Sequence, residues 1–351
     1  MAFGRPSKPR QIKAWPDMTG LSPLLREQDL PARGRGVRFH IDFSHVEKVD
    51  AIGISIFLAR LAQVSAGADE VKVSVSWPKQ PETNSKLKAL SLSQHLVALG
   101  LEDNPERSLF DLLDDSVMQN MLSGQPPGNG LEAEKIILIM PNPQGSRTSV
   151  IDGAKKEIKK FLAIDHERSF AHEQLMIILL EMVKNTVDHS GRPAFLGLSF
   201  KRSSNGIHFE FSYCDSGDGI GRSVRRHIEK VASEFSRNST DSDGIFSGSS
   251  GRLLRLVKKG GLSDILHWAL QPGNSTKSGN GVNFGLGLML IVESARNCGI
   301  RLSLKDADSI WALTELSSPY SHSEIRQLGI KTCAAPLLMF HGEMERKNVY
   351  R

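Results

Sequence analysis

Residues 171–191 read AHEQLMIILLEMVKNTVDHSG, and this stretch decides the fold of the chain around it. Its apolar residues recur at steps of three and four, which predicts one buried face of a helix. Glu181 and Asn185 are one helical turn apart and project together from another face. Gly191 and Pro193 are expected to end the helix. The apolar positions are Leu175, Ile178, Leu179, Met182 and Val183.

The same polar pair has a plainer interpretation. Glu181 and Asn185 are also what the solvated side of any amphipathic helix carries. Two further stretches of the chain favour a functional role.

The first of these stretches is a strand that runs into a glycine-rich turn. Residues 207–221 read IHFEFSYCDSGDGIG, in which apolar and polar residues alternate before Asp215. The glycines after it, at Gly217, Gly219 and Gly221, permit positive φ and close approach of the backbone to a ligand.

The second stretch, residues 269–292, reads ALQPGNSTKSGNGVNFGLGLMLIV. Gly285 and Gly287 open a strongly apolar helix, and the free N–H groups at such a helix start can receive a phosphate.

These three stretches, in this order, resemble the nucleotide-binding boxes of the GHKL ATPases, the family of DNA gyrase B, the heat-shock chaperones, MutL and the histidine kinases. Glu181-x-x-x-Asn185 is similar to the N box and Asp215-x-Gly217-x-Gly219 to the first glycine box. Gly285-Leu286-Gly287-Leu288 is similar to the second glycine box, preceded by a segment, Ser275-Thr276-Lys277, that resembles the family's "STK". The resemblance covers residues 148–317, and Asn283 stands where the second box usually begins with glycine.

The resemblance implies a site for ATP and Mg²⁺. Glu181 would orient and deprotonate the attacking water, and Asn185 would offer an oxygen to Mg²⁺. Asp215 would accept a hydrogen bond from the adenine amino group, with Gly217, Gly219 and Gly221 in the turn beneath the base. The phosphates would meet Thr276, Lys277, Gly285, Leu286, Gly287 and Leu288. Asp188 either bonds a ligand water or caps a neighbour, and His189 is expected to be structural or exposed.

The N-terminal part predicts alternating strands and helices. Residues 37–43 and 71–77 alternate as strands, whereas 52–63 and 84–99 have helical patterns. The stretch IDFSHVEKVDAIGISIFLARLA resembles the STAS domain of anti-sigma-factor antagonists, through Asp42, Ser44, Val49, Asp50, Gly53 and Leu58. The antagonists' phosphorylated serine would follow Asp50, where this chain has Ala51, which has no hydroxyl to accept a phosphoryl group.

The expected fold class is α/β, a STAS-like β-α sandwich followed by a two-layer α+β GHKL (Bergerat) ATP-binding domain. Further strands are expected at 135–140, 194–202, 207–214, 300–305 and 309–316, and a helix at 149–163. The expected boundaries are a basic tail at 1–36, the STAS-like domain at 37–103, a Pro/Gly linker at 104–130, the ATPase domain at 131–318 with a long lid at 222–283, and a C-terminal extension at 319–351.

Composition narrows the setting in which the chain works. The 351 residues carry a formal net charge of +5, and no apolar run reaches the roughly 20 residues of a membrane helix. Three scattered cysteines and the lack of a secretory signal indicate a cytoplasmic protein with reduced thiols. The basic tail could touch nucleic acid, but no interleaved aromatic residues support base stacking, so a solvated tail is expected.

Two classes of function follow from these patterns. The first is an ATPase whose lid closure switches contacts with a regulatory protein partner or with a second copy. The second is a protein kinase in bacterial signalling, of the histidine type or of the anti-sigma serine type. A non-hydrolysing ATP sensor is a third alternative.

Overall fold

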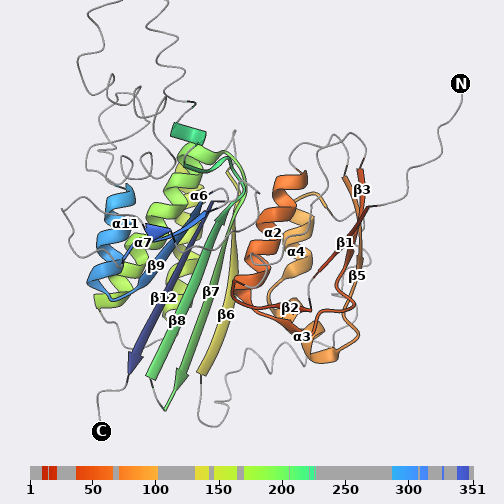
Figure 1. Ribbon diagram of the computed structural model, residues 1–351, viewed down its shortest axis with the longest axis horizontal. Helices are drawn as coiled ribbons and strands as arrows, with labels where there is room; N and C mark the ends of the chain where they lie inside the picture. Colours follow the sequence, from red (N-terminus) through yellow and green to blue (C-terminus); the bar gives the residue numbers. More distant parts are fainter. Residues whose placement is uncertain are drawn as a thin grey trace, which may run out of the picture. The chain divides into compact units, whose positions relative to one another are not determined.

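The computed structural model (Figure 1) shows a mixed α/β protein whose described residues fall into two compact units. Unit 1 comprises Met1–Leu138, Pro193–Ser216 and Glu343–Arg351, and unit 2 comprises Ile139–Arg192 and Gly217–Gly342. The structure describes residues 10–14, 16–21, 37–65, 71–101, 131–141, 146–163, 170–204, 206–220, 222–224, 226, 287–306, 309–314, 326–327 and 338–347.

Unit 1 begins with a parallel sheet in the order β1-β3-β5, formed by β1 (Arg10–Lys13), β3 (Val37–Asp42) and β5 (Val71–Ser76). The chain crosses from β3 to β5 through α2 (Ala51–Ser65), which confirms the expected strand–helix–strand order. A two-residue strand, β2 (Asp17–Met18), pairs in parallel with β4 (Lys48–Val49). The segment expected to be a solvated tail therefore contains two strands.

The helix α2 is the core of unit 1, because every residue from Ala51 to Ala62 is buried. A helix that is apolar on all sides must be covered on all sides. Asp50 caps its N-terminus: the N–H of Gly53 donates to Asp50 Oδ1 and that of Gly20 to Oδ2, both at 2.7 Å. Burial raises the pKa of Asp50 above its usual value, and these two hydrogen bonds oppose the rise.

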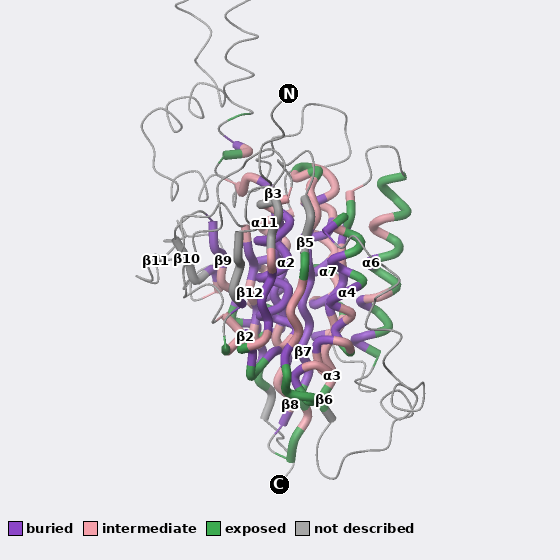
Figure 2. Tube along the Cα trace, turned by 90° about the vertical axis from the view of Figure 1, so that its right-hand side faces the viewer, coloured by how far each residue is buried: buried purple, intermediate pink, exposed green. Residues whose placement is uncertain are grey.

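Part of that cover is a hairpin distant in sequence. β7 (Ala194–Ser203) and β8 (Gly206–Asp215) pair antiparallel and α2 packs on them, a region that is largely buried in Figure 2. The Oγ atoms of Ser55 and Ser212 lie 2.6 Å apart, and a Cβ on Gly197 would lie 2.5 Å from the carbonyl oxygen of Ala51. This packing groups the hairpin with the N-terminal segment, so the units differ from the domain boundaries expected from sequence order.

The second strand group of unit 1 has the hydrogen-bonded order β12-β8-β7-β6. β6 (Leu131–Ile139) matches the buried strand expected at 135–140. β12 (Leu338–Lys347), which has residues in both units, lies in the segment expected to be a C-terminal extension. That segment therefore supplies a strand to the sheet.

The helix expected at 84–99 is two helices, so the prediction of one continuous helix is wrong. α3 (Pro81–Ala89) and α4 (Leu92–Ala98) are separated at Ser91, whose φ of +56° is left-handed. A left-handed residue cannot continue a right-handed helix. Gly100, with φ of +68°, follows the end of α4 as its sequence pattern predicts.

The helices described for unit 2 include α6 (Arg147–Leu162), α7 (Phe170–Asn185) and α11 (Gly287–Asn297). All five apolar positions predicted for α7 are at most 1% exposed, which confirms the helix and its buried face. A π-helical turn, η3 (Thr186–Ser190), extends α7 to Gly191, whose φ of +61° ends it.

Three strands of unit 2 form the order β11-β10-β9, with β9 (Arg301–Asp306) and β10 (Ser309–Ala312) antiparallel and β11 (Arg326–Gln327) beside β10. The strand expected at 300–305 is confirmed, and of the one expected at 309–316 the structure shows a strand that ends at Ala312. The expected linker, and the lid apart from residues 222–224 and 226, lie outside the described residues. Within the described residues, each helix is too short or too polar to cross a membrane.

Because α2 packs closely on the hairpin, we expect alanine to change the stability of the protein differently at Gly197 and at Gly153. We expect Gly197→Ala to lower the free energy of unfolding by about 1–3 kcal/mol, because the new Cβ displaces the backbone of Ala51. Gly153→Ala, on α6 with nothing within 4 Å, should stabilise the helix by up to about 1 kcal/mol. Urea unfolding of both variants measures this, and equal effects would contradict the close packing.

The buried His95 predicts a dependence of stability on pH. His95 is 8% exposed and meets Phe195 edge-on, and burial lowers its pKa to about 4 against the hydrogen bond to Leu90, which raises it. Below about pH 6.5 the unfolded chain binds a proton at His95 that the folded chain does not bind. The stability that the neutral, buried His95 contributes above that pH is therefore lost as the pH falls towards 4. Between pH 7 and pH 5, wild type should lose about 2 kcal/mol more stability in urea than His95→Leu. Parallel curves for the two proteins would refute this.

Candidate functional site

The first group of candidate residues lies where α11 begins against α7, within unit 2. A Cβ on Gly287 would lie 3.3 Å from Glu181 Oε2 and 3.5 Å from Asn185 Oδ1. The acid and the amide therefore point together at the start of α11, as their spacing of one turn predicts. We call Glu181, Lys184, Asn185 and Gly287 the acid–amide cluster.

The start of α11 is closely approached by the two side chains of α7. A Cβ on Gly287 would be in tight contact with Glu181 Oε2 and in ordinary van der Waals contact with Asn185 Oδ1. The backbone N–H groups of the first turn of α11 have no partner inside the helix, and groups of this kind bind phosphate oxygens at helix starts.

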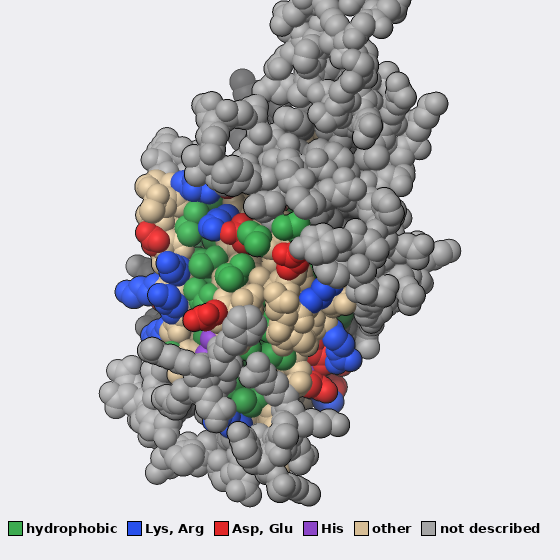
Figure 3. Space-filling model, turned by 90° about the vertical axis from the view of Figure 1, so that its left-hand side faces the viewer, with side chains coloured by type: hydrophobic (Ala, Val, Ile, Leu, Met, Phe, Trp, Pro, Cys, Tyr) green, Lys and Arg blue, Asp and Glu red, His purple; other side chains and the backbone are tan. Residues whose placement is uncertain are grey.

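Two ion pairs set the charges around this cluster. Lys184 Nζ lies 2.5 Å from Glu181 Oε1, a pair three residues apart on α7. Arg147 of α6 grips Asp188 of η3 with two hydrogen bonds, Nε to Oδ1 at 2.5 Å and Nη2 to Oδ2 at 2.9 Å. The bonds to Asp188 raise the pKa of Arg147 above its usual value, and the charge of Glu181 adds to that effect. Charges of both signs also border apolar side chains on the face in Figure 3.

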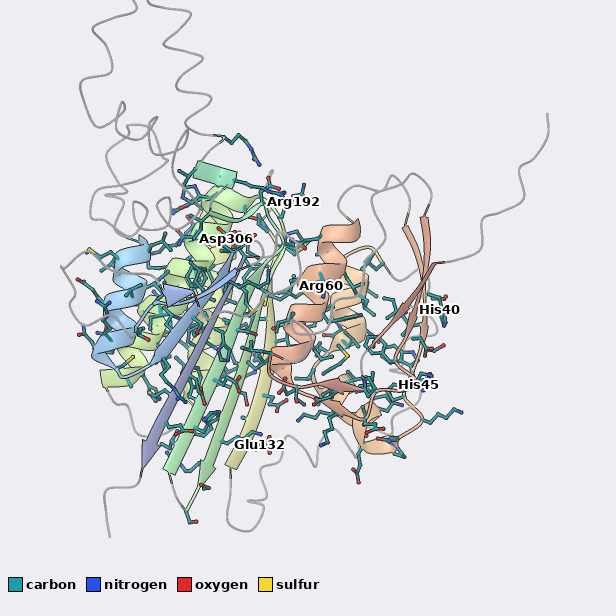
Figure 4. The ribbon with its side chains drawn as sticks, in the orientation of Figure 1. His40, His45, Arg60, Glu132, Arg192 and Asp306 are labelled. Carbon is teal, nitrogen blue, oxygen red and sulfur yellow. The ribbon has the colours of Figure 1, made fainter. Side chains whose placement is uncertain are left out.

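The glycine turn after β8 forms a second group in unit 2. Gly219 has a φ of +80°, and a Cβ there would lie 2.2 Å from Oδ1 of Asp306, a residue only 3% exposed at the end of β9. Asp218 pairs with Arg226, and this bond holds the pKa of Asp218 below its usual value, with help from the charges of Arg192 and Arg222. Figure 4 labels Asp306 and Arg192 among these side chains.

Asp215, the expected adenine-binding acid, belongs to unit 1. It is the last residue of β8, pairs in register with Ala194 and is 4% exposed. The next residue, Ser216, anchors the chain there, because its N–H and its Oγ both donate to the carbonyl oxygen of Pro193, at 3.1 and 2.6 Å. A buried carboxylate at a strand end is a polar group that requires hydrogen-bond donors.

The other candidates are placed as follows. Gly217 is buried, Leu288 is half-buried in the first turn of α11, and His189 is exposed on η3, as expected. Asp188, whose role the sequence left open between ligand water and cap, carries the pair with Arg147. Gly221, Thr276, Lys277, Gly285 and Leu286 lie outside the described residues.

Lys184, Arg147 and Asp306 are among the residues of these groups that the sequence patterns did not single out. Lys184 could have been found, since it stands three positions after Glu181 on a predicted helix. Arg147 and Asp306 gave no signal, because each meets its partner only through the tertiary fold.

No family model matches the chain, and no curated protein shows significant similarity to its sequence.

The residues present suit a magnesium–nucleotide. Mg²⁺ takes oxygen ligands and keeps several waters, which a single amide oxygen such as Asn185 Oδ1 permits. A carboxylate beside it, that of Glu181, can accept a proton from water. Gly287 carries no side chain at the start of α11, and the start of a helix is a place where phosphate oxygens bind.

Proposed function

We propose that this chain is an ATP-binding protein of the GHKL type that hydrolyses ATP with Mg²⁺ in the cytoplasm. The observation that carries the proposal is the approach of Glu181 Oε2 and Asn185 Oδ1 to Gly287 at the first residue of α11. Cleavage of a β–γ phosphate bond uses an oriented water, a metal ion and donors to the phosphate oxygens, and an acid, an amide and a helix start could supply these.

Each residue of the acid–amide cluster then has a role. Asn185 would hold Mg²⁺, which supplies neutralisation of phosphate charge when bound. Glu181 accepts the proton of the attacking water at Oε2, while its Oε1 is held by Lys184. Lys184 thus fixes the orientation of the carboxylate. Leu288 belongs to the same helix start.

The family resemblance assigns recognition of adenine to Asp215. A buried carboxylate that accepts a hydrogen bond from an exocyclic amino group selects adenine over guanine, which presents a carbonyl oxygen at that position. The left-handed Gly219 and the buried Gly217 support a backbone turn beside the base. Thr276, Lys277, Gly285 and Leu286 are proposed phosphate contacts, with Gly221 in the turn.

For the N-terminal part we propose a STAS-like domain, supported by the parallel order β1-β3-β5 and the crossover helix α2. Ala51 stands where the antagonists carry a phosphorylated serine. It is fully buried, and its N–H donates to Glu134 Oε2 at 3.2 Å. Since this position has neither a hydroxyl nor exposure, phosphorylation there by the chain itself is disfavoured.

Ala51 therefore disfavours transfer of a phosphoryl group to the chain's own STAS-like part. It favours hydrolysis, with lid closure acting on a regulatory partner or a second copy. A kinase that acts on a separate protein, and a sensor that binds without turnover, are the competing outcomes of the experiment below.

Glu181→Gln should keep ATP binding and lower the rate of hydrolysis by about 10²- to 10⁴-fold, because the amide keeps the shape of the carboxylate but cannot take a proton. Glu173→Gln is the matched control, since Glu173 is exposed on the same helix. The measurement is release of free phosphate from γ-labelled ATP with Mg²⁺, alongside nucleotide affinity by calorimetry.

The destination of the label decides between the alternatives. Free phosphate lost in Glu181→Gln but kept in Glu173→Gln supports the ATPase. Label on a polypeptide would replace the ATPase by a kinase, and binding without either product would leave a sensor.

Asp215→Asn should abolish ATP binding, because the amide loses the negative charge and one of the two accepting oxygens of the carboxylate, and with them the charge-assisted hydrogen bond from the adenine amino group. Asp152→Asn, an exposed change on α6, controls for the loss of one acid. Affinity for a fluorescent ATP analogue is the readout, with circular dichroism as a check of folding. A folded Asp215→Asn protein with normal affinity would remove Asp215 from the adenine site.

A further inference from the structure

A second set of ionisable side chains gathers in unit 1, on β8 and the adjacent strand β12. His208 Nδ1 lies 3.9 Å from Glu343 Oε1 and 3.8 Å from Glu345 Oε1. One ligand atom from each of the three residues lies within 4.8 Å of the other two. We call His208, Glu343 and Glu345 the strand-pair cluster.

Strand geometry explains why these side chains meet. Glu343 and Glu345 are two positions apart on β12 and therefore share one face. Side chains opposite each other on neighbouring strands have their Cβ atoms about 5 Å apart, so His208 reaches both. The arrangement is fixed by a sheet rather than by a loop, which keeps the three groups on one patch.

His208 Nδ1 lies near both carboxylates without a hydrogen bond to either. A hydrogen bond from an imidazole nitrogen to a carboxylate spans about 2.7–3.2 Å, and both contacts of His208 Nδ1 are longer. Two carboxylates held this close repel each other, and a cation between them would relieve that repulsion.

A fourth group, Glu210, stands on the other side of the imidazole. Its Oε2 lies 3.8 Å from His208 Nε2, two positions along β8 on the same face. Metal-binding histidines commonly donate their second ring N–H to a carboxylate, which fixes the tautomer that leaves the first nitrogen for the metal. Glu210 is placed to do so for a metal bound at Nδ1.

We propose that the strand-pair cluster binds one divalent transition-metal ion, through His208 Nδ1 and the carboxylates of Glu343 and Glu345. A mixed nitrogen and oxygen set suits zinc, manganese or iron(II), whereas calcium and magnesium prefer oxygen alone. The side chains of His208 and Glu343 are 31% and 28% exposed and that of Glu345 is 63% exposed, so they can close the remaining distance and water can complete the coordination. This site is independent of the proposed ATPase activity.

The test is titration calorimetry of the nucleotide-free full chain with Zn²⁺ and with Mn²⁺. We expect saturable binding of one ion, weakened by about tenfold or more in His208→Thr and in Glu343→Gln. Threonine is compatible with a strand, so folding should be preserved, and circular dichroism checks this. Glu210→Gln should weaken binding by about tenfold, as the loss of an outer partner does.

Three controls make the result decisive. His45→Thr removes an exposed histidine of unit 1, Glu132→Gln removes an exposed acid of β6, and Asp152→Asn removes an exposed acid of α6. All three should bind the metal as wild type does. Absence of saturable binding, or equal affinity in His208→Thr and wild type, would overturn the proposal and leave an ion-pair network.

Discussion

The packing of α11 on α7 at a glycine is the contact from which the proposed chemistry follows. Gly287 is the first residue of α11, and Glu181 and Asn185 place two oxygens 3.3 and 3.5 Å from where its Cβ would lie. The buried stripe of α7, including Ile178 and Val183 with no exposed surface, fixes which way the polar pair faces. An apolar face that must be buried thereby orients a polar face that must stay open.

Glycine at a close approach organises unit 1 as well. A Cβ on Gly53 would lie 2.0 Å from the carbonyl oxygen of Met18, and Gly197 approaches Ala51 almost as closely. These two contacts let α2 sit between a short N-terminal strand and the β7–β8 hairpin. Because α2 is covered on all sides, the segment that resembles a STAS domain shares its core with strands more than a hundred residues away. At the start of α2, the N–H of Ala51 also donates to Glu134 Oε2.

The sequence predicted the elements whose signals are local. The stripe of α7, its end at Gly191, the β7–β8 hairpin and the strands β9 and β10 all follow from periodicity and turn residues within short windows. The break at Ser91 escaped prediction because a serine in the left-handed region has no strong sequence signature. The strands β1 and β12 escaped it because they are held by partners far along the chain, within segments whose composition looked like tails.

The candidate site also combines residues with a local sequence signal and residues that tertiary contacts bring in. Glu181 and Asn185 were found from one helical turn, and Gly287 from its place before an apolar run. The grip of Arg147 on Asp188 and the approach of Asp306 to Gly219 depend on tertiary contacts that no single stretch encodes. The sequence left the role of Asp188 open, and in the structure Asp188 accepts two hydrogen bonds from Arg147.

A crystal structure of the full chain with Mg²⁺ and a non-hydrolysable ATP analogue tests the central claim most directly. The prediction is a metal ion coordinated by Asn185 Oδ1, phosphate oxygens against the backbone N–H groups that begin at Gly287, and Glu181 facing the terminal phosphate. A nucleotide bound elsewhere, with the acid–amide cluster unchanged and solvated, would contradict it.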